Sequence, residues 1–145
     1  MLEKLKAATF EVLETMLYLF PESLEDGEVM PARGPFLRSW VRIIGPQPLR
    51  IGLVVPQSLA RKMAANFLGT TEEEIYKPEM EDVLKETTNM MAGAFLSKLE
   101  ASAAFNLQTP EAEWLEPAEK QKKTPTHRLR FDVDDELMEM FVEKG

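Results

Sequence analysis

The chain has 145 residues, 44% of them hydrophobic, and a formal net charge of −8 at pH 7. This length fits one domain, residues 1–145, with a hydrophobic core. The acidic balance argues against nucleic acid or an anionic membrane as the main partner, because both favour clustered Lys and Arg. The sequence contains no Cys, which excludes disulfides and thiolate metal sites. No apolar run reaches the roughly 20 residues that cross a bilayer, and no signal-peptide core is present, so we expect a soluble, cytoplasmic protein.

The N-terminal half predicts two helices and a hairpin. An amphipathic helix is expected over residues 2–20, ended by Pro21, with a loop over 22–34. Strands over 36–44 and 49–55 flank the turn sequence Gly45-Pro-Gln-Pro48 and predict a β-hairpin. A second helix is expected over 56–68 with Gly69 at its C-terminal end. Thr71-Glu-Glu-Glu74 then resembles a capping box.

The C-terminal half predicts one long helix followed by strands. The helix spans 79–99, and a strand over 104–109 is expected to stop at Pro110. Residues 111–126 are charged and contain two prolines, which indicates a long loop. Alternation over 127–133, a turn at Asp134-Asp135 and a strand over 137–142 predict a second hairpin. The fold class is therefore α+β: an antiparallel sheet of about five strands, packed on one side by two long helices and one shorter helix.

Most sites for covalent and cofactor chemistry are missing from the sequence. Its only histidine is His127, and it contains no Gly-x-Ser-x-Gly elbow, phosphate-binding loop or dinucleotide fingerprint. Arg38, Arg42 and Arg50 lie around the first hairpin and are candidates for anion binding, although a solvent-facing sheet surface is the simpler interpretation. We expect no cofactor bound by this chain alone.

The long helix combines a core side with an unusual polar side. Its core side is expected to consist of Met80, Val83, Leu84, Thr87, Met91, Ala94, Phe95 and Leu99. Asp82, Glu86, Asn89 and Gly93 follow each other at i, i+4, i+7 and i+11, so they share another face. Thr87, Thr88 and Asn89 are weak helix formers, and Gly93 costs about 1 kcal/mol relative to Ala. This choice of residues indicates a purpose other than helix stability.

Glu86 and Asn89 form the chemically useful pair on this face. A carboxylate can bind a lysine of another molecule, and a carboxamide can donate and accept hydrogen bonds at once, as orienting a water molecule requires. The pair therefore suits assisted hydrolysis of a phosphoryl group held elsewhere, where positioning supplies most of the catalysis. A polar helix face that is merely solvated explains the same residues.

The same stretch resembles a known signature. Asp82-x3-Glu86-x2-Asn89, followed by Met-Met-Ala-Gly-Ala and by Thr109-Pro110 about twenty residues beyond the Asn, resembles the motif of the CheC/CheX/FliY chemotaxis phosphatases and is closest to CheX. Lys98-Leu99-Glu100, Leu68-Gly69 and the ending Val142-Glu-Lys-Gly145 add to the likeness.

The resemblance implies a phosphatase that hydrolyses the aspartyl phosphate of a CheY-type response regulator. The phosphate, its Mg²⁺ and the aspartate would all belong to the regulator. By similarity, Glu86 would pair with the regulator's lysine and Asn89 would hold the attacking water. Asp82 would support the helix face, Pro110 would shape the adjoining strand, and Gly93 would let the partner approach closely.

The resemblance also bears on the number of sites and the oligomer. The first helix has Glu11-x2-Glu14, with an acid at the Asn position, so we expect one site per chain. A homodimer joined through the sheets is expected, with the C-terminal hairpin as a candidate edge. Two alternatives stay open: a non-catalytic adaptor that binds a receiver domain or another chemotaxis partner, and a dimeric scaffold whose polar face is only solvated.

Overall fold

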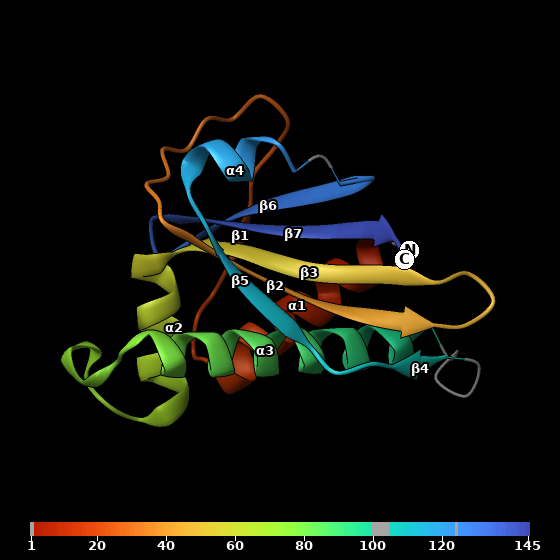
Figure 1. The fold of residues 1–145 in the computed structure, drawn as a ribbon, viewed down its shortest axis with the longest axis horizontal. Coiled ribbons are helices and arrows are strands. Elements are labelled where there is room, and N and C mark those ends of the chain that lie inside the picture. The colour runs from red at the N-terminus through yellow and green to blue at the C-terminus, as the bar shows by residue number, and fades with distance from the viewer. Residues whose placement is uncertain (1, 100–104, 124) are drawn as a thin grey trace.

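A computed structural model of the chain describes residues 2–99, 105–123 and 125–145 (Figure 1). The helices are α1 (Leu2–Met16), α2 (Gln57–Leu68), α3 (Lys77–Lys98) and α4 (Pro117–Gln121), with a 3₁₀ turn η1 (Glu72–Glu74) before α3. The strands are β1 (Glu22–Ser23), β2 (Phe36–Ile44), β3 (Leu49–Pro56), β4 (Asn106–Leu107), β5 (Glu111–Leu115), β6 (His127–Val133) and β7 (Glu136–Lys144).

All strands belong to one antiparallel sheet. Its order is β1-β6-β7-β3-β2-β4, and β5 also pairs with β2. Both predicted hairpins are present, as β2–β3 and β6–β7. Asp134 and Asp135 both have positive φ angles, 54° and 67°, which is the backbone that a tight two-residue hairpin turn requires.

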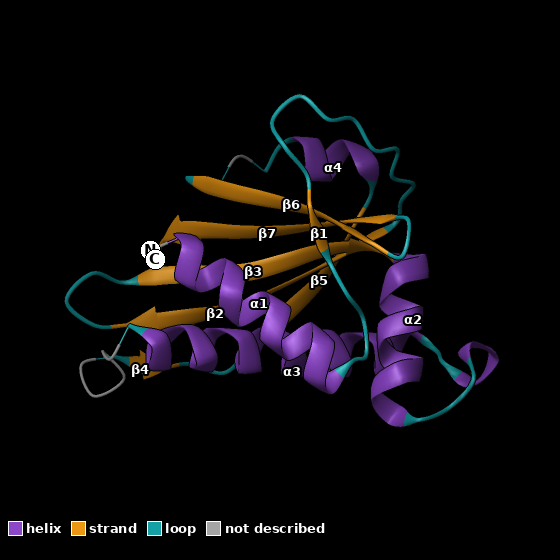
Figure 2. Cartoon of the chain, turned by 180° about the vertical axis from the view of Figure 1, so that it is seen from behind, coloured by secondary structure: helices purple, strands orange, loops and turns teal. Residues whose placement is uncertain are grey.

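The helices α1 and α3 cover one face of the sheet, and α2 stands at one end (Figures 1 and 2). The main core lies between these helices and the sheet. A smaller cluster on the opposite face contains Phe36, Val54, Leu115 and Phe141, and α4 covers it with Lys120 over the Phe36 ring. The predicted α+β class is confirmed, and the described part of the chain contains seven strand segments in place of about five. Among the described residues, no helix is long and apolar enough to cross a bilayer.

The predicted long loop over 111–126 is wrong. Its first part is β5, which pairs with β2 from Phe36 to Trp40, and its second part contains α4. Its charges misled the prediction because β5 is an edge strand, whose carboxylates pair with neighbouring cations. Thr124 lies outside the described residues.

Pro110 does not end the strand pairing, as the sequence suggested; it interrupts it. Ile43 pairs with Leu107 before this point and Trp40 pairs with Glu111 after it, so the outer chain has one extra residue. This shift defines a β-bulge, where proline is tolerated because no ladder hydrogen bond is needed from it. Ala104, the predicted start of the strand, lies outside the described residues.

Two helix ends also differ from prediction. The first helix ends at Met16 instead of residue 20, because Tyr18 adopts the left-handed conformation with φ 55°. The capping box suggested by Thr71-Glu-Glu-Glu74 is not formed, because the Thr71 side chain makes no capping hydrogen bond. A capping hydrogen bond is found instead at the start of α3, where the Tyr76 backbone N–H donates to the Glu79 carboxylate at 2.8 Å. Gly69 caps α2 with φ 69°, as predicted.

Candidate functional site

Helix α3 is fixed along one edge of the sheet, packed against α1, β2, β4 and β5. Of its predicted core side, Met80, Val83, Leu84, Thr87, Met91 and Phe95 are buried, whereas Ala94 and Leu99 are half-buried. The edge strand adds a polar attachment: Trp114 Nε1 donates to Glu81 Oε2 at 2.7 Å. The Lys77 ammonium lies 5.0 Å from the centre of the Trp114 ring. This contact was not predicted, although a tryptophan inside a charged stretch was an available signal in the sequence.

The two threonines in the middle of α3 belong to the fold. Both are buried, and their hydroxyls donate to the carbonyls four residues earlier, Thr87 to Val83 (2.7 Å) and Thr88 to Leu84 (2.8 Å). Threonine is tolerated here because its hydroxyl finds a partner inside its own helix. Of the weak helix formers, only Asn89 and Gly93 remain without a structural explanation.

The predicted polar row lies together on the accessible side of α3. Asp82 and Glu86 are exposed, and Asn89 is half-buried. Asp82 contacts Lys85 at 3.6 Å within the same helix. Among the described residues, neither Glu86 nor Asn89 has a side-chain hydrogen-bond or ion-pair partner. The structure thus brings a carboxylate and a carboxamide onto one accessible surface of a fixed helix.

Gly93 and Pro110 occupy different parts of this region. A Cβ added at Gly93 would meet only Leu107 Cδ1, at 3.9 Å, an ordinary contact distance. The fold itself therefore does not require glycine there. Pro110 lies in the bulge of the edge strand that packs beside α3, and it is half-buried. It belongs to the surroundings of the helix face and not to its polar row.

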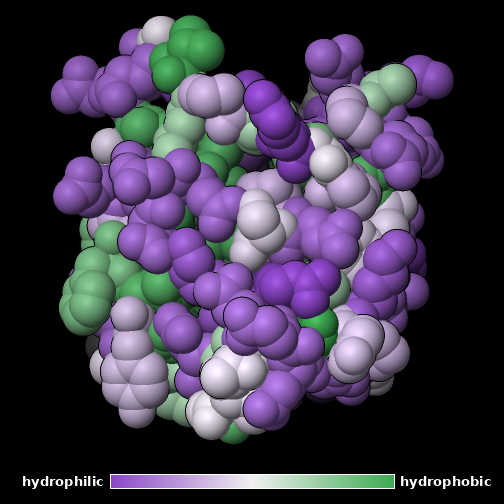
Figure 3. Space-filling model, turned by 90° about the vertical axis from the view of Figure 1, so that its left-hand side faces the viewer, coloured by the Kyte–Doolittle hydropathy of each residue, from purple (hydrophilic) through white to green (hydrophobic). Residues whose placement is uncertain are grey.

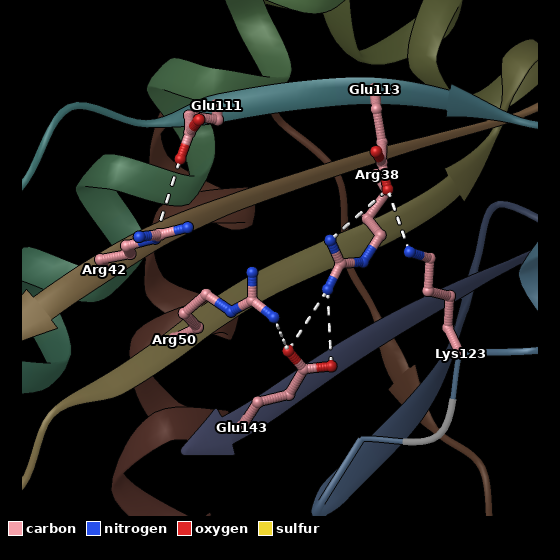
Figure 4. A network of polar contacts seen from close by, with 7 residues as sticks. All are labelled: Arg38, Arg42, Arg50, Glu111, Glu113, Lys123 and Glu143. Carbon is pink, nitrogen blue, oxygen red and sulfur yellow. Dashed lines mark hydrogen bonds and ion pairs between the residues drawn. The ribbon is translucent and has the colours of Figure 1, made fainter. Parts of the chain in front are cut away.

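The arginines of the first hairpin do not form an open anion site. Arg38 was expected on a solvent-facing surface but is only 4% exposed; it lies between the Trp40 and Phe141 rings, 4.7 and 4.4 Å from their centres. Its guanidinium is paired with Glu143 at 3.4 Å and Glu113 at 3.6 Å (Figure 4). Burial lowers the pKa of Arg38, and the two carboxylates oppose that shift.

Other candidate chemistry is weaker. His127 lies exposed on β6. In the described part of the chain, no group of three or more His, Asp or Glu side chains is arranged to hold a metal ion. The main clefts formed by the described residues are lined by other elements than α3.

The fold and the site together define an α+β scaffold with a polar row on one accessible side of a fixed helix. Residues 39–134, well over half of the chain, match the model of the family described as chemotaxis phosphatase CheX, and the chain belongs to this family. No curated protein sequence matches the chain.

Solved structures agree with this fold. A chemotaxis protein CheX from Desulfovibrio desulfuricans has a TM-score of 0.73 at 18% identity, covering 99% of this chain and 97% of that chain. The CheX of the CheX–CheY–BeF₃–Mg²⁺ complex from Borrelia burgdorferi has a TM-score of 0.70 at 19% identity, covering 99% and 97%. FliY from Thermotoga maritima has a TM-score of 0.64 at 13% identity, covering 97% and 84%.

Proposed function

We propose that this chain dephosphorylates the aspartyl phosphate of a CheY-type response regulator. The observation that carries the proposal is the outward row of α3, whose Glu86 and Asn89 serve no purpose inside the described fold. Membership of the chemotaxis phosphatase family and the solved complex of a CheX with CheY both support a receiver domain as the partner.

Glu86 is the docking residue in this proposal. Its exposed carboxylate stands on a helix that is already held in place, so little ordering is lost when it pairs with a lysine of the receiver. A charge-assisted hydrogen bond of this kind contributes about 1.5–3 kcal/mol. Asp82 lies one turn earlier, and its contact with Lys85 balances the negative charge of the row.

Asn89 is the catalytic residue. Its carboxamide can accept a hydrogen bond from a water molecule and donate another, which aligns that water with the phosphorus of the bound receiver. It stands one turn beyond Glu86, so the pairing of Glu86 with the receiver fixes where the amide lies. The chain needs no cofactor of its own, because the Mg²⁺ and the phosphorylated aspartate belong to the receiver.

The site's surroundings have supporting roles. Gly93 continues the row without a side chain, which leaves room for the receiver surface close to the helix backbone. Pro110 keeps the bulge that ends the β4 pairing beside α3. A homodimer and a cytoplasmic location stay predictions; β6 offers an edge for the former, since β1 covers only Phe131 and Asp132.

The test is the decay of a phosphorylated CheY-type receiver with Mg²⁺. We expect the protein to accelerate decay and Asn89→Ala to return it to the intrinsic rate while binding stays within about threefold. Glu86→Ala should weaken binding by about tenfold or more, the equivalent of one charge-assisted hydrogen bond. Gln47→Ala and Glu73→Ala remove the same functional groups from exposed positions elsewhere and should change neither quantity. If the wild-type protein binds the receiver without accelerating decay, it is an adaptor.

A further inference from the structure

A cleft of about 570 Å³ lies away from α3, between the segment after α1, helix α2, η1 and the β6–β7 turn. We call it the aromatic–acidic cleft, after Tyr18, Phe20 and five carboxylate residues that line it. Figure 3 views the side of the molecule where α2 and the β6–β7 turn lie, and hydrophilic side chains dominate this surface.

Both aromatic rings of the cleft are open to solvent. Tyr18 is 70% exposed and Phe20 is 69% exposed. Leu17, before Tyr18, and Leu19, between the two aromatic residues, are buried. The two leucines therefore hold this segment in the hydrophobic core, and the two aromatic rings point to solvent. Exposed aromatic side chains beside a hollow are a common feature of protein-binding surfaces, because rigid rings bury much area with little loss of side-chain entropy.

Tyr18 occupies a position where glycine would suit the backbone better. It follows the end of α1 with φ 55°, and the Leu19 N–H donates to the Leu13 carbonyl at 3.0 Å. This is the left-handed end of a helix, where glycine is strongly preferred because it has no Cβ. The fold thus gives no reason for the tyrosine ring at this position.

The charge of the cleft identifies the chemistry of an occupant. Its five carboxylates face one cation, Lys62, which is already paired with Asp134 at 2.8 Å. Among the described residues, the exposed side chains of Glu22 and Glu72 form no ion pair. An arginine side chain meets both features at once, since its guanidinium stacks on aromatic rings and binds carboxylates through paired hydrogen bonds.

We propose that the aromatic–acidic cleft binds an arginine-bearing segment of a partner protein. None of the residues that line the cleft comes from α3, so the contact adds a second docking surface to the helix face. Nucleic acid and anionic lipid are disfavoured as occupants because the carboxylates repel phosphate groups.

The probe is the peptide acetyl-Gly-Arg-Gly-Arg-Gly-amide, titrated into the full-length protein in about 0.15 M salt, where long-range charge effects are screened. Amide chemical shifts measured by NMR report the place of binding and its affinity. Tyr18→Gly keeps every charge, and we expect it to weaken binding by about three- to tenfold through loss of the ring. Its melting temperature should stay unchanged or rise by roughly 2–4 °C, because glycine suits the backbone there.

The charges are tested separately. Glu22→Gln with Glu72→Gln should weaken binding by about three- to tenfold, whereas the matched pair Glu3→Gln with Glu14→Gln on α1 should change it by less than about twofold. Shifts centred on Tyr18, Phe20 and Asn66 support the proposal. Shifts spread evenly over the acidic surface, equal affinity of Tyr18→Gly and the wild type, or equal effects of the two charge pairs would overturn it.

Discussion

Two polar regions of this protein differ in whether their side chains are paired within the fold. On the sheet, Arg38 is buried between two rings and paired with Glu143 and Glu113, and Arg50 reaches Glu143 at 2.8 Å (Figure 4). On α3, Glu86 and Asn89 stand at the surface without a partner among the described residues.

The difference separates residues that serve folding from residues available to a partner. A buried guanidinium must be paired, so its neighbours are explained once its burial is known. A half-buried carboxamide without a partner in a helix interior is slightly unfavourable and stabilises nothing nearby. Polar groups of the second kind are therefore where a function should be sought, and variants in the two regions should behave in opposite ways.

The largest expected effect comes from breaking the sheet network. Arg38→Ala should lower the free energy of unfolding by about 3 kcal/mol, because it leaves two carboxylates short of a cation and opens space between the rings. Urea unfolding measures the change. Arg42→Ala, on the same strand face, is the control: its pair with Glu111 at 3.9 Å is more than half exposed on both sides and should contribute less than about 0.5 kcal/mol. Equal losses in both variants would contradict the assignment.

Two glycines extend the comparison. Gly93→Ala should raise the free energy of unfolding by about 1 kcal/mol, because the helix gains a better former and the new methyl group has room. Gly52→Ala should lower it, since its Cβ would overlap the Ser39 carbonyl and the Phe141 ring. Thermal unfolding gives both signs. Destabilisation by Gly93→Ala would show that the fold requires this glycine. If Gly93→Ala is instead more stable but accelerates receiver dephosphorylation less than the wild type, the glycine serves contact with the receiver.

The polar row should be nearly neutral for folding. Asn89→Ala and Glu86→Gln should each change the free energy of unfolding by no more than about 0.5 kcal/mol, because neither side chain has a partner to lose. Denaturant unfolding of the same preparations used for the phosphatase assay checks this. A loss of more than about 1.5 kcal/mol in either variant would place the residue among the structural polar groups.

The sequence predicted the regions with strong periodicity and missed those that depend on long-range pairing. The core side of α3 and the alternating strand at 127–133 carry their own pattern, and both are confirmed. Arg38 was expected at the surface because its partners Phe141 and Glu143 come from the far end of the chain. Nothing in the sequence around Arg38 indicates that they contact it. The loop prediction for 111–126 failed for the same reason, since β5 exists through its pairing with β2.

The candidate site was more predictable than its surroundings. Spacing alone placed Asp82, Glu86 and Asn89 on one face, because a helix fixes the relation of its own residues. Their accessibility could not be predicted from the sequence, because it depends on which side of α3 meets the sheet; in the structure Asp82 and Glu86 are exposed and Asn89 is half-buried. The Trp114 contact with Glu81 was missed because it joins the helix to a strand that was not predicted.

The smallest effect concerns a polar pair between the two extremes. Lys62 on α2 pairs with Asp134 in the β6–β7 turn, and the hydrogen bond to Asp134 raises the pKa of Lys62 above its ordinary value of 10.5. A raised pKa means that the folded state binds the proton more tightly. The pair therefore stabilises the protein fully below pH 10.5, and this contribution is lost as pH rises through the folded-state pKa. Lys62→Met should flatten the fall in unfolding free energy that begins as pH rises above 10.5. Asp134→Asn removes the same pair while suiting the positive φ of this position, so it should also flatten the curve, but by less, because Glu136 stays 3.6 Å from the Lys62 ammonium. A steep fall that persists in both variants would assign the alkaline instability to other groups and leave the Lys62 pair without effect on folding.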